Sequence, residues 1–280
     1  MIAAAIMDYK FVRSTRAYVL RSKLANAMRI FLISSLRFPM YRSHKFFLNS
    51  VLLAGLFSCA TATTKRLPFT GNVAYSSNYL SRGITQSNDN FSLQGGFDYA
   101  HESGFYLGTW AAGVEFRGTN TGDLPAAYQE LDGYGGYKGV LGTGLGYDLG
   151  FIHYAYPGAN SSLNYDFNEV YISLGYRFGT VDVGLGVKYS NDYWGGTGNA
   201  TYTHAKADYK LDTNWSVSLS AGHQTIEDNV GWGHEDHTVV GASGHYALAD
   251  YCTATVGWSK ANLTGDLGDH KIYAVLGMRF

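Results

Sequence analysis

The stretch Phe91–Trp110, FSLQGGFDYAHESGFYLGTW, contains two segments of alternating apolar and polar residues separated by a short break. The apolar residues of the first segment are Phe91, Leu93, Phe97 and Tyr99. A period of two is typical of a β-strand with one apolar face. The break His101–Gly104 suits a tight turn, so the stretch predicts a β-hairpin. The fold depends on whether its apolar face meets a protein core or lipid.

The same alternation recurs along the chain after residue 63, where no amphipathic helix of useful length is found. Twelve alternating segments can be counted, at residues 71–82, 91–101, 104–117, 127–138, 144–156, 168–178, 181–190, 199–211, 214–224, 237–248, 251–260 and 271–280. Several have an unbroken period of two, such as Val181–Tyr189 and Ile272–Phe280. The pattern predicts an all-β fold of about twelve strands.

The gaps between these segments alternate in length. The short gaps are 101–104, 138–143, 179–180, 211–214 and 248–250, and the long ones are 83–90, 118–126, 157–167, 191–198, 225–236 and 261–270. Outer-membrane barrels combine short periplasmic turns with longer extracellular loops. Because every backbone polar group must be paired in hydrocarbon, such a sheet has to close. We therefore expect residues 63–280 to form a closed antiparallel transmembrane β-barrel, in which no loop looks long enough to form a large plug.

A secretory signal peptide is predicted at residues 40–62. Arg42 and Lys45 precede the apolar run Phe46–Phe57, and Ala60–Ala62 supplies a small-residue cleavage site. These are the parts of a cleaved export signal, and the run is too short to cross a bilayer as a helix. We expect cleavage after Ala62.

The residues before this signal are basic and unlike the rest of the chain. Residues 1–39 are interpreted as an upstream extension, with a genuine long leader as the alternative. The residues Leu56–Cys59 loosely resemble a lipoprotein cleavage box, which leaves lipidation of Cys59 open.

The composition of residues 63–280 excludes several classes of protein. This part holds 12 Lys and Arg against 21 Asp and Glu, a formal charge of −9. An acidic exported chain is a poor nucleic-acid binder, so no nucleic-acid partner is expected. Cys252 is its one cysteine, so it cannot form an internal disulfide.

The chain ends on an alternating segment whose last residue is Phe280. A terminal aromatic residue on such a strand resembles the signal that the bacterial barrel-assembly machinery reads. The expected partners are therefore this machinery, the lipid bilayer with its lipopolysaccharide, and small solutes.

Aromatic residues gather near the ends of the predicted strands. The set is Tyr79, Tyr99, Tyr106, Trp110, Phe116, Tyr156, Tyr189, Trp258 and Phe280. Girdles of Tyr and Trp at the two membrane interfaces would place them there. The alternative is that aromatic residues simply favour strands.

The first half of the barrel region resembles the TorF porin family of proteobacterial outer-membrane proteins. The resemblance rests on Ser77–Ile84 with Gln86, Gln94–Tyr99, Gly104–Trp110, Tyr147–Gly150 and Tyr154–Gly158. It extends over residues 70–280, although beyond residue 200 it depends on the strand pattern and Phe280. The resemblance implies passive passage of solutes and names no substrate.

If the apolar faces meet lipid, the opposite faces line the barrel interior. The predicted pore-lining residues are Arg82, Asp98, Glu115, Arg117, Glu130, Asp132, Asp148, Arg177, Asp182 and Lys188, with Glu169, Lys206, Asp208 and Lys210 on the same faces. Charges concentrate on inward faces because an Arg or Lys facing lipid costs about 2–4 kcal/mol at the midplane. The acidic group Glu130, Asp132 and Asp148 would favour cations. Alternatively, these acids form a network with the arginines that rigidifies a narrow barrel.

The long loops are acidic. They carry ten Asp and Glu residues and no Lys or Arg, which would enrich cations at the outer rim, although ordinary solvated loops would look the same.

The strongest metal candidate is Gly233–His237, but His234 and His237 lie in a loop and a zinc site needs three or four fixed ligands. Gly142–Gly146 lacks the Lys of a phosphate-binding loop. We expect no metal and no cofactor.

The sequence thus predicts an outer-membrane porin-like channel for small polar solutes with a mild preference for cations. The main alternative is a structural or surface-interaction barrel with an occluded interior. A lipid-modifying outer-membrane enzyme is a minor alternative, because no nucleophile elbow is present and no Ser–His pair can be chosen. We expect the chain not to be an enzyme.

Overall fold

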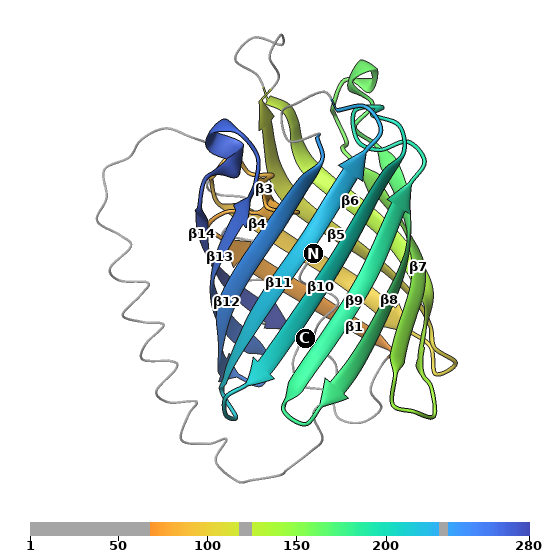
Figure 1. Cartoon of the computed structure of the whole chain (residues 1–280), viewed down its shortest axis with the longest axis vertical. Helices are drawn as coiled ribbons and strands as arrows, with labels where there is room; N and C mark the ends of the chain where they lie inside the picture. The colour runs from red at the N-terminus through yellow and green to blue at the C-terminus, as the bar shows by residue number, and fades with distance from the viewer. Residues whose placement is uncertain (1–67, 118–124, 230–234) are drawn as a thin grey trace, which may run out of the picture. The chain divides into compact units, whose positions relative to one another are not determined.

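The computed structural model describes residues 68–117, 125–229 and 235–280, and the predicted extension and signal peptide lie outside them. In the described part, twelve antiparallel strands close into a barrel (Figure 1). The wall consists of β1 (Phe69–Ser76), β4 (Ser92–Ala100), β5 (Phe105–Arg117), β6 (Pro125–Val140), β7 (Gly146–Ala155), β8 (Phe167–Phe178), β9 (Val181–Ser190), β10 (Ala200–Lys210), β11 (Trp215–Ile226), β12 (His237–Ala249), β13 (Cys252–Ala261) and β14 (Lys271–Arg279). This confirms the predicted closed barrel of about twelve strands.

The first and last strands of the wall close the ring. β1 pairs with β4 on one side and with β14 on the other. Gly71 and Phe280 exchange two backbone hydrogen bonds, with N···O distances of 2.8 and 2.9 Å. The sheet therefore has no open edge, as a hydrocarbon environment requires.

The two faces of the wall differ as the sequence predicts. Large apolar side chains point outward and are exposed, including Phe97 on β4, Leu219 on β11 and Val256 on β13. Gln94 of the opening stretch points inward and is buried, and Asp98 accepts a hydrogen bond inside the barrel. The outer belt of apolar side chains suits lipid, and the polar side chains face the interior.

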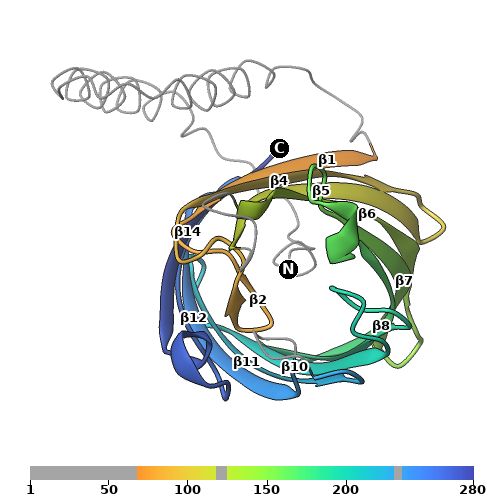
Figure 2. The same ribbon diagram turned by 90° about the horizontal axis from the view of Figure 1, so that it is seen from above.

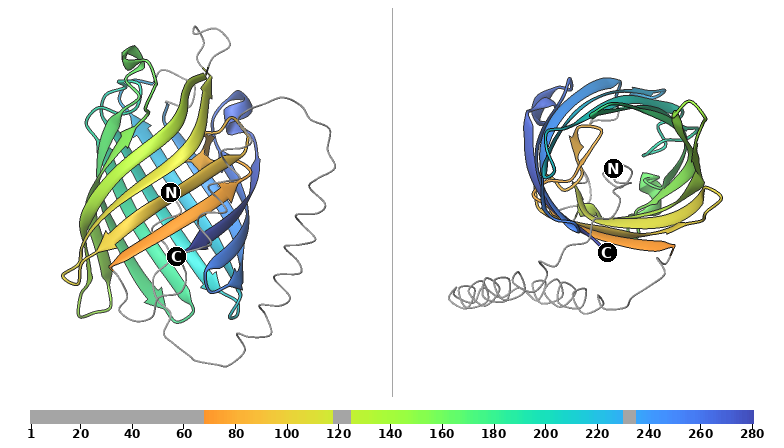
Figure 3. Two further views of the ribbon diagram at one scale, coloured as in Figure 1. Left: turned by 180° about the vertical axis from the view of Figure 1, so that it is seen from behind. Right: turned by 90° about the horizontal axis from the view of Figure 1, so that it is seen from below.

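The connections alternate in length around the ring. The short turns are 101–104, 141–145, 179–180, 211–214 and 250–251, and they share one rim, here called the short-turn rim (Figures 1 and 3). The opposite, long-loop rim carries the 3₁₀-helices η2 (Ser161–Leu163) and η3 (Gly265–Gly268). No helix in the described residues is long and apolar enough to cross a membrane.

The first long loop differs from the prediction. The sequence predicts one strand over residues 71–82, but β1 ends at Ser76 and residues 77–91 leave the wall. They fold into the interior and form a small hairpin, β2 (Leu80–Ser81) with β3 (Ile84–Thr85), seen inside the ring in Figure 2. We call this segment the inward loop.

A tight turn at the tip of the inward loop explains the difference. Arg82 and Gly83 both have positive φ, 51° and 85°. Two left-handed central residues are characteristic of the type I′ turn of a two-residue hairpin. The alternation of Leu80 and Ile84 continues the pattern of β1, so periodicity alone does not reveal that the chain turns inward.

The predicted aromatic girdles are partly wrong. Tyr79, Tyr106 and Tyr156 are buried inside the barrel, and Trp110 and Phe116 also lie inside, against a buried cluster. Tyrosine combines an apolar ring with a hydroxyl that finds partners in a polar interior. Tyr189 and Phe280 do lie on the outer surface, where a girdle would be.

Candidate functional site

Polar side chains form a buried band where the inward loop meets the wall. The band comprises Tyr79, Arg82, Glu130, Asp132, Tyr154, Glu169, Lys188 and Gln224. Two of them come from the inward loop and the others from β6, β7, β8, β9 and β11. Because residues far apart in the chain meet here, closure of the barrel creates the site.

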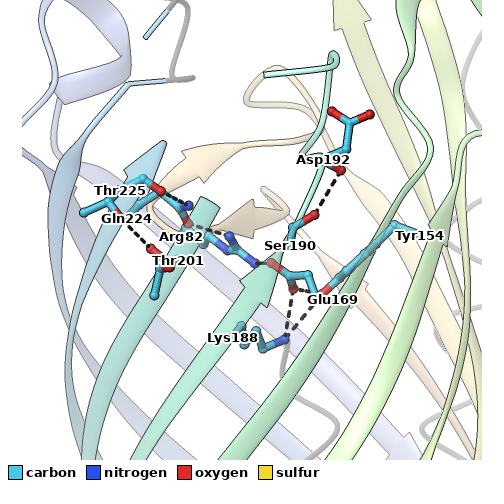
Figure 4. A network of polar contacts seen from close by, with 9 residues as sticks. All are labelled: Arg82, Tyr154, Glu169, Lys188, Ser190, Asp192, Thr201, Gln224 and Thr225. Carbon is cyan, nitrogen blue, oxygen red and sulfur yellow. Dashed lines mark hydrogen bonds and ion pairs between the residues drawn. The ribbon is translucent and has the colours of Figure 1, made fainter. Parts of the chain in front are cut away.

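Arg82 connects the inward loop to two distant strands. Its guanidinium donates hydrogen bonds to Glu169 of β8 and to Gln224 of β11 (Figure 4). Its charge also lies over the rings of Tyr193 and Tyr202, 5.1 and 4.7 Å from their centroids. Hydrogen bonds between ionised groups in a buried setting are among the strongest in proteins, so Arg82 fixes the tip of the loop.

The carboxylate of Glu169 is fully occupied. One oxygen accepts from Arg82, and the other accepts from the hydroxyl of Tyr154 at 3.0 Å and lies 3.8 Å from the ammonium of Lys188. Lys188 also donates to the Tyr154 hydroxyl at 3.3 Å (Figure 4). This part of the band is a satisfied network.

The other two carboxylates of the band, Glu130 and Asp132, have fewer hydrogen-bond donors. The hydroxyl of Tyr79 donates to Glu130 Oε1 at 3.3 Å. Glu130 Oε2 and Asp132 Oδ1 are buried and have no hydrogen-bond partner in the described part of the chain. A buried polar atom without a partner is rare in native proteins.

Toward the short-turn rim, the inward-facing charges are reached by water. Arg177 and Asp182 form an ion pair with side chains 57% and 32% exposed. Lys206 and Asp208 pair at 3.0 Å with side chains 36% and 30% exposed. The interior is therefore hydrated at this end, in contrast to the buried band.

Aromatic rings on the inward face lie close over glycines of the neighbouring strand. The directly opposed pairs are Tyr134 with Gly108, Tyr106 with Gly136, Tyr171 with Gly150, His204 with Gly186 and Tyr273 with Gly257. A Cβ added at Gly108 would lie 2.3 Å from the ring of Tyr134. Glycine thus makes room for rings that lie along the wall and do not project across the interior.

Two of these tyrosines also hold lumen carboxylates. Tyr134 donates to Asp98 at 2.6 Å, and Tyr106 donates to Asp148 at 2.5 Å. The predicted lining residues Asp98 and Asp148 therefore face the interior. Each accepts a hydrogen bond from a neutral tyrosine hydroxyl and does not pair with an arginine.

The remaining predicted lining residues divide into three groups. Glu130, Asp132, Arg177, Asp182 and Lys188 lie on inward faces of the wall. Arg82 is inside the barrel, but on the inward loop and not on a strand of the wall. Glu115 accepts from the amides of Asn88 and Asn90 of that loop, at 3.0 and 2.9 Å, and the Arg117 side chain lies outside the described residues.

Several residues of the band were not singled out from the sequence for this role. Gln224 and Tyr154 gave no signal, because Tyr and Gln occur on either face of a strand. The sequence pattern places Tyr79 in the outer girdle. The register of the strand pairs would have shown that Lys188 and Gln224 lie at the same level of the barrel, because both stand opposite Tyr202 of β10. Periodicity alone does not give this register.

The predicted metal candidate is not assembled in the described residues. His234 lies outside them. His237 is buried, with Nδ1 2.8 Å from the carbonyl oxygen of Glu235 and Nε2 3.1 Å from that of Arg82. It therefore supports the inward loop, and no group of three His, Cys, Asp or Glu residues suited to a metal is found in the described part of the chain.

His245 contacts two serines inside the barrel, although the sequence did not bring such a pair together. Its Nε2 lies 2.9 Å from Ser218 Oγ and 3.0 Å from Ser243 Oγ. Ser218 donates its proton to Asp208, however, so His245 cannot accept that proton as a general base does. The geometry supports a lumen hydrogen-bond network.

The fold is that of outer-membrane porins. The KdgM porin shares 8% identity at a TM-score of 0.52, over 75% of this chain and 98% of that one. The NanC porin gives 8% identity and a TM-score of 0.52, over 76% and 98% of the two chains. A structure of the KdgM porin in complex with disordered oligogalacturonate gives 6% and 0.50, over 76% and 98%. At such low identity these similarities show the fold alone.

Comparison with curated proteins gave no match. A family model described as a bacterial protein of unknown function (Gcw_chp) matches residues 60–265, which include almost the whole barrel. The chain therefore belongs to the Gcw_chp family of bacterial proteins, and its barrel has the fold of the outer-membrane porins.

Proposed function

We propose that this protein is an outer-membrane channel for the passive passage of small polar solutes, with a preference for cations. The observation that carries the proposal is the partial exposure of the inward-facing charges Arg177, Asp182, Lys206 and Asp208. Water that reaches these groups inside a closed barrel supplies a polar path from the short-turn rim up to the buried band. Passage would be limited at the band.

The charge of the band supports the preference for cations. Glu130, Asp132 and Glu169 provide three carboxylates against the two cations Arg82 and Lys188. Rings of carboxylates at a constriction favour cations. An oligogalacturonate, as in the KdgM complex, is a polyanion and would meet the wrong charge here.

Ion selectivity measured in planar lipid bilayers tests the proposal. Under a salt gradient, the reversal potential of the wild-type barrel should show preference for cations, and E130K/D132K should shift it toward anions. D250K/D266K is a matched control, since it makes the same charge change on exposed side chains of a turn and a loop. An equal shift in both variants would assign selectivity to overall charge and not to the band.

A second candidate is a barrel whose interior is occluded. The buried band favours it, since Arg82 and Glu169 have side chains only 5% and 1% exposed. Such a barrel would be a structural or surface-interaction protein. Absence of both conductance and liposome swelling at every salt concentration would establish this reading and reject the channel.

A lipid-modifying enzyme would need a surface Ser–His pair oriented by a third group. The contacts of His245 with Ser218 and Ser243 face the lumen. His101 and Ser103 form an exposed pair in the turn 101–104, at 2.7 Å, but the contact uses Nδ1 of His101, and no hydrogen bond to its Nε2 is found among the described residues. A lipase assay on purified protein should show no hydrolysis. Hydrolysis lost on substitution of a surface serine would overturn this expectation.

The export route and the TorF resemblance are part of the proposal. Cleavage after Ala62 would deliver residues 63–280 to the outer membrane, with its lipids and lipopolysaccharide around the apolar belt. N-terminal sequencing of the protein from outer membranes tests the cleavage site. We propose that the barrel belongs to the porin group that the TorF resemblance names. The motif Ser77–Ile84, which carries part of that resemblance, covers most of the hairpin of the inward loop.

We also propose that the barrel-assembly machinery reads the last strand through Phe280. The side chain of Phe280 is exposed on the outer surface. Its ring packs edge-on against that of Phe97, with a centroid distance of 6.2 Å. F280A should lower the amount of folded barrel in the outer membrane. M278A, which alters an outward residue of the same strand, is the control.

A further inference from the structure

Two carboxylates of the band are buried without adequate partners. Glu130 and Asp132 are 3% and 5% exposed, and they project from the same face of β6 because they are two residues apart. Glu130 Oε2 and Asp132 Oδ1 have no hydrogen-bond partner among the described residues. Burial of an unpaired carboxylate is costly, so such a pair requires either protons or a positively charged partner.

Both cations of the band pair with Glu169. Arg82 pairs with one oxygen of Glu169, and Lys188 lies 3.8 Å from the other. Glu169 in addition accepts from Tyr154. The band therefore retains one more carboxylate than it has cations, and its buried carboxylate oxygens without a hydrogen-bond donor among the described residues are Glu130 Oε2 and Asp132 Oδ1.

Aromatic residues surround this acidic pair. Trp110 of β5 and Tyr154 of β7 stand directly opposite Asp132 in the two neighbouring strands, all on the inward face. Tyr79 donates to Glu130 and packs edge-on against Trp110, with a centroid distance of 5.3 Å. Carboxylates combined with aromatic rings are the setting in which proteins bind organic ammonium groups.

The same surroundings disfavour a divalent metal ion. Calcium and magnesium require six or more oxygen ligands, many of them carboxylates, carbonyls or waters. In the described part of the chain, no three His, Cys, Asp or Glu side chains are grouped in a way that could hold a metal. An alkylammonium group needs only one or two acceptors and accepts ring faces as its other neighbours.

We propose that Glu130 and Asp132, together with Trp110 and Tyr79, form a subsite for the ammonium group of a small organic cation. The inference rests on the proposed channel function and deepens it, because it names small amines as the class of solute that the band selects. Tyr79 belongs to the inward loop, so the subsite is complete only when that loop is folded into the barrel.

Binding can be measured without any reference to conductance. We would titrate n-butylammonium chloride into the full barrel purified in detergent and follow the heat of binding and the fluorescence of its tryptophans. E130Q/D132N keeps the shape of both side chains and removes their charge. Its affinity should fall by about tenfold or more.

The control is D250N/D266N, which removes two carboxylates from exposed positions of a turn and a loop. This variant should bind butylammonium as the wild type does. Circular dichroism and heat-modifiable migration on gels check that each variant forms the barrel. If E130Q/D132N fails to fold, W110L, which keeps the carboxylates and removes the ring, is tested in its place and should also lose affinity.

Each outcome decides the proposal. Loss of binding confined to E130Q/D132N supports the subsite. Equal binding by wild type, E130Q/D132N and the control overturns it, as does a barrel that binds Mg²⁺ but no butylammonium. A barrel that binds butylammonium without conducting would reject the channel and leave the subsite standing, whereas conduction without binding would reject only the subsite.

Discussion

Arg82 at the tip of the inward loop and Glu169 on β8 form an ion pair whose side chains are both almost completely buried. The pair ties a segment that left the wall after β1 to a strand on another side of the barrel (Figures 2 and 4). Arg82 adopts a left-handed backbone conformation, which is unfavourable for a residue with a side chain. The contacts of the guanidinium offset that cost and fix the loop inside the barrel.

The first prediction concerns R82A. Removing one partner of a buried ion pair typically destabilises by about 3–5 kcal/mol, because the other charge is left uncompensated. We expect the inward loop to detach while the barrel wall persists. Single-channel conductance should rise, and the backbone amide of Gln86, which donates to Tyr79, should exchange hydrogen faster.

R177A is the matched control for this prediction. Arg177 also pairs with an inward-facing acid, Asp182, but both side chains are partly exposed near the short-turn rim. Exposed pairs contribute about 0–1 kcal/mol, so R177A should leave the exchange of Gln86 unchanged. Equal exchange rates in R82A and the wild type would mean that other contacts hold the loop.

The second prediction concerns the glycines under the aromatic rings. A Cβ at Gly257 would lie 2.2 Å from the ring of Tyr273 on β14. G257A should therefore displace that ring and destabilise the barrel by about 1–3 kcal/mol, the usual cost of overpacking. Urea-induced unfolding in lipid vesicles measures the change.

Gly244 on β12 provides the comparison, since a Cβ there meets no atom within 4 Å. G244A should leave the unfolding midpoint close to that of the wild type. If G257A and G244A behaved alike, the fit between Gly257 and Tyr273 would have no energetic consequence.

These contacts also mark where sequence reasoning succeeds and where it stops. The closed barrel follows from local signals: a period of two, alternating gap lengths and a last alternating segment that ends in Phe280. Closure requires no knowledge of which residues meet. The outward orientation of Phe97 and the inward orientation of Gln94 also follow from the sequence, because a strand of such a barrel has only one apolar face.

The band could not be predicted in this way. Arg82 meets Glu169 only because a turn directs residues 77–91 inward, and the turn consists of Arg-Gly, where Asn-Gly is the usual signal. Tyr79 was misplaced because the preference of tyrosine for strands says nothing about which face it occupies. Contacts between residues so distant in the chain depend on register and closure together.

The third prediction concerns acid pH at the long-loop rim. The backbone N–H of Asn199 donates to Glu227 at 2.9 Å, which lowers the pKa of this carboxyl. The contact therefore stabilises the rim above the ordinary pKa of Glu, and the stabilisation is lost as pH falls through the lowered value. Hydrogen-exchange protection of the Asn199 amide, corrected for the intrinsic rate, should decrease over that acid range.

E227Q isolates the charge, because the glutamine oxygen can still accept the hydrogen bond. Protection of Asn199 in this variant should not change with pH over the same range. A decrease that persisted in E227Q would assign the acid sensitivity to another group.

The last prediction tests which side of the wall faces lipid. Leu219 points outward from the middle of β11 and is one of the more exposed apolar side chains, whereas Leu211 lies in the turn before that strand. An arginine facing lipid costs about 2–4 kcal/mol at the midplane and about 0–1 kcal/mol near an interface. L219R should therefore destabilise the barrel in phosphatidylcholine vesicles far more than L211R, as measured by reversible urea titration. In a barrel surrounded by water the two variants would be equally stable, since each would place an arginine in solvent.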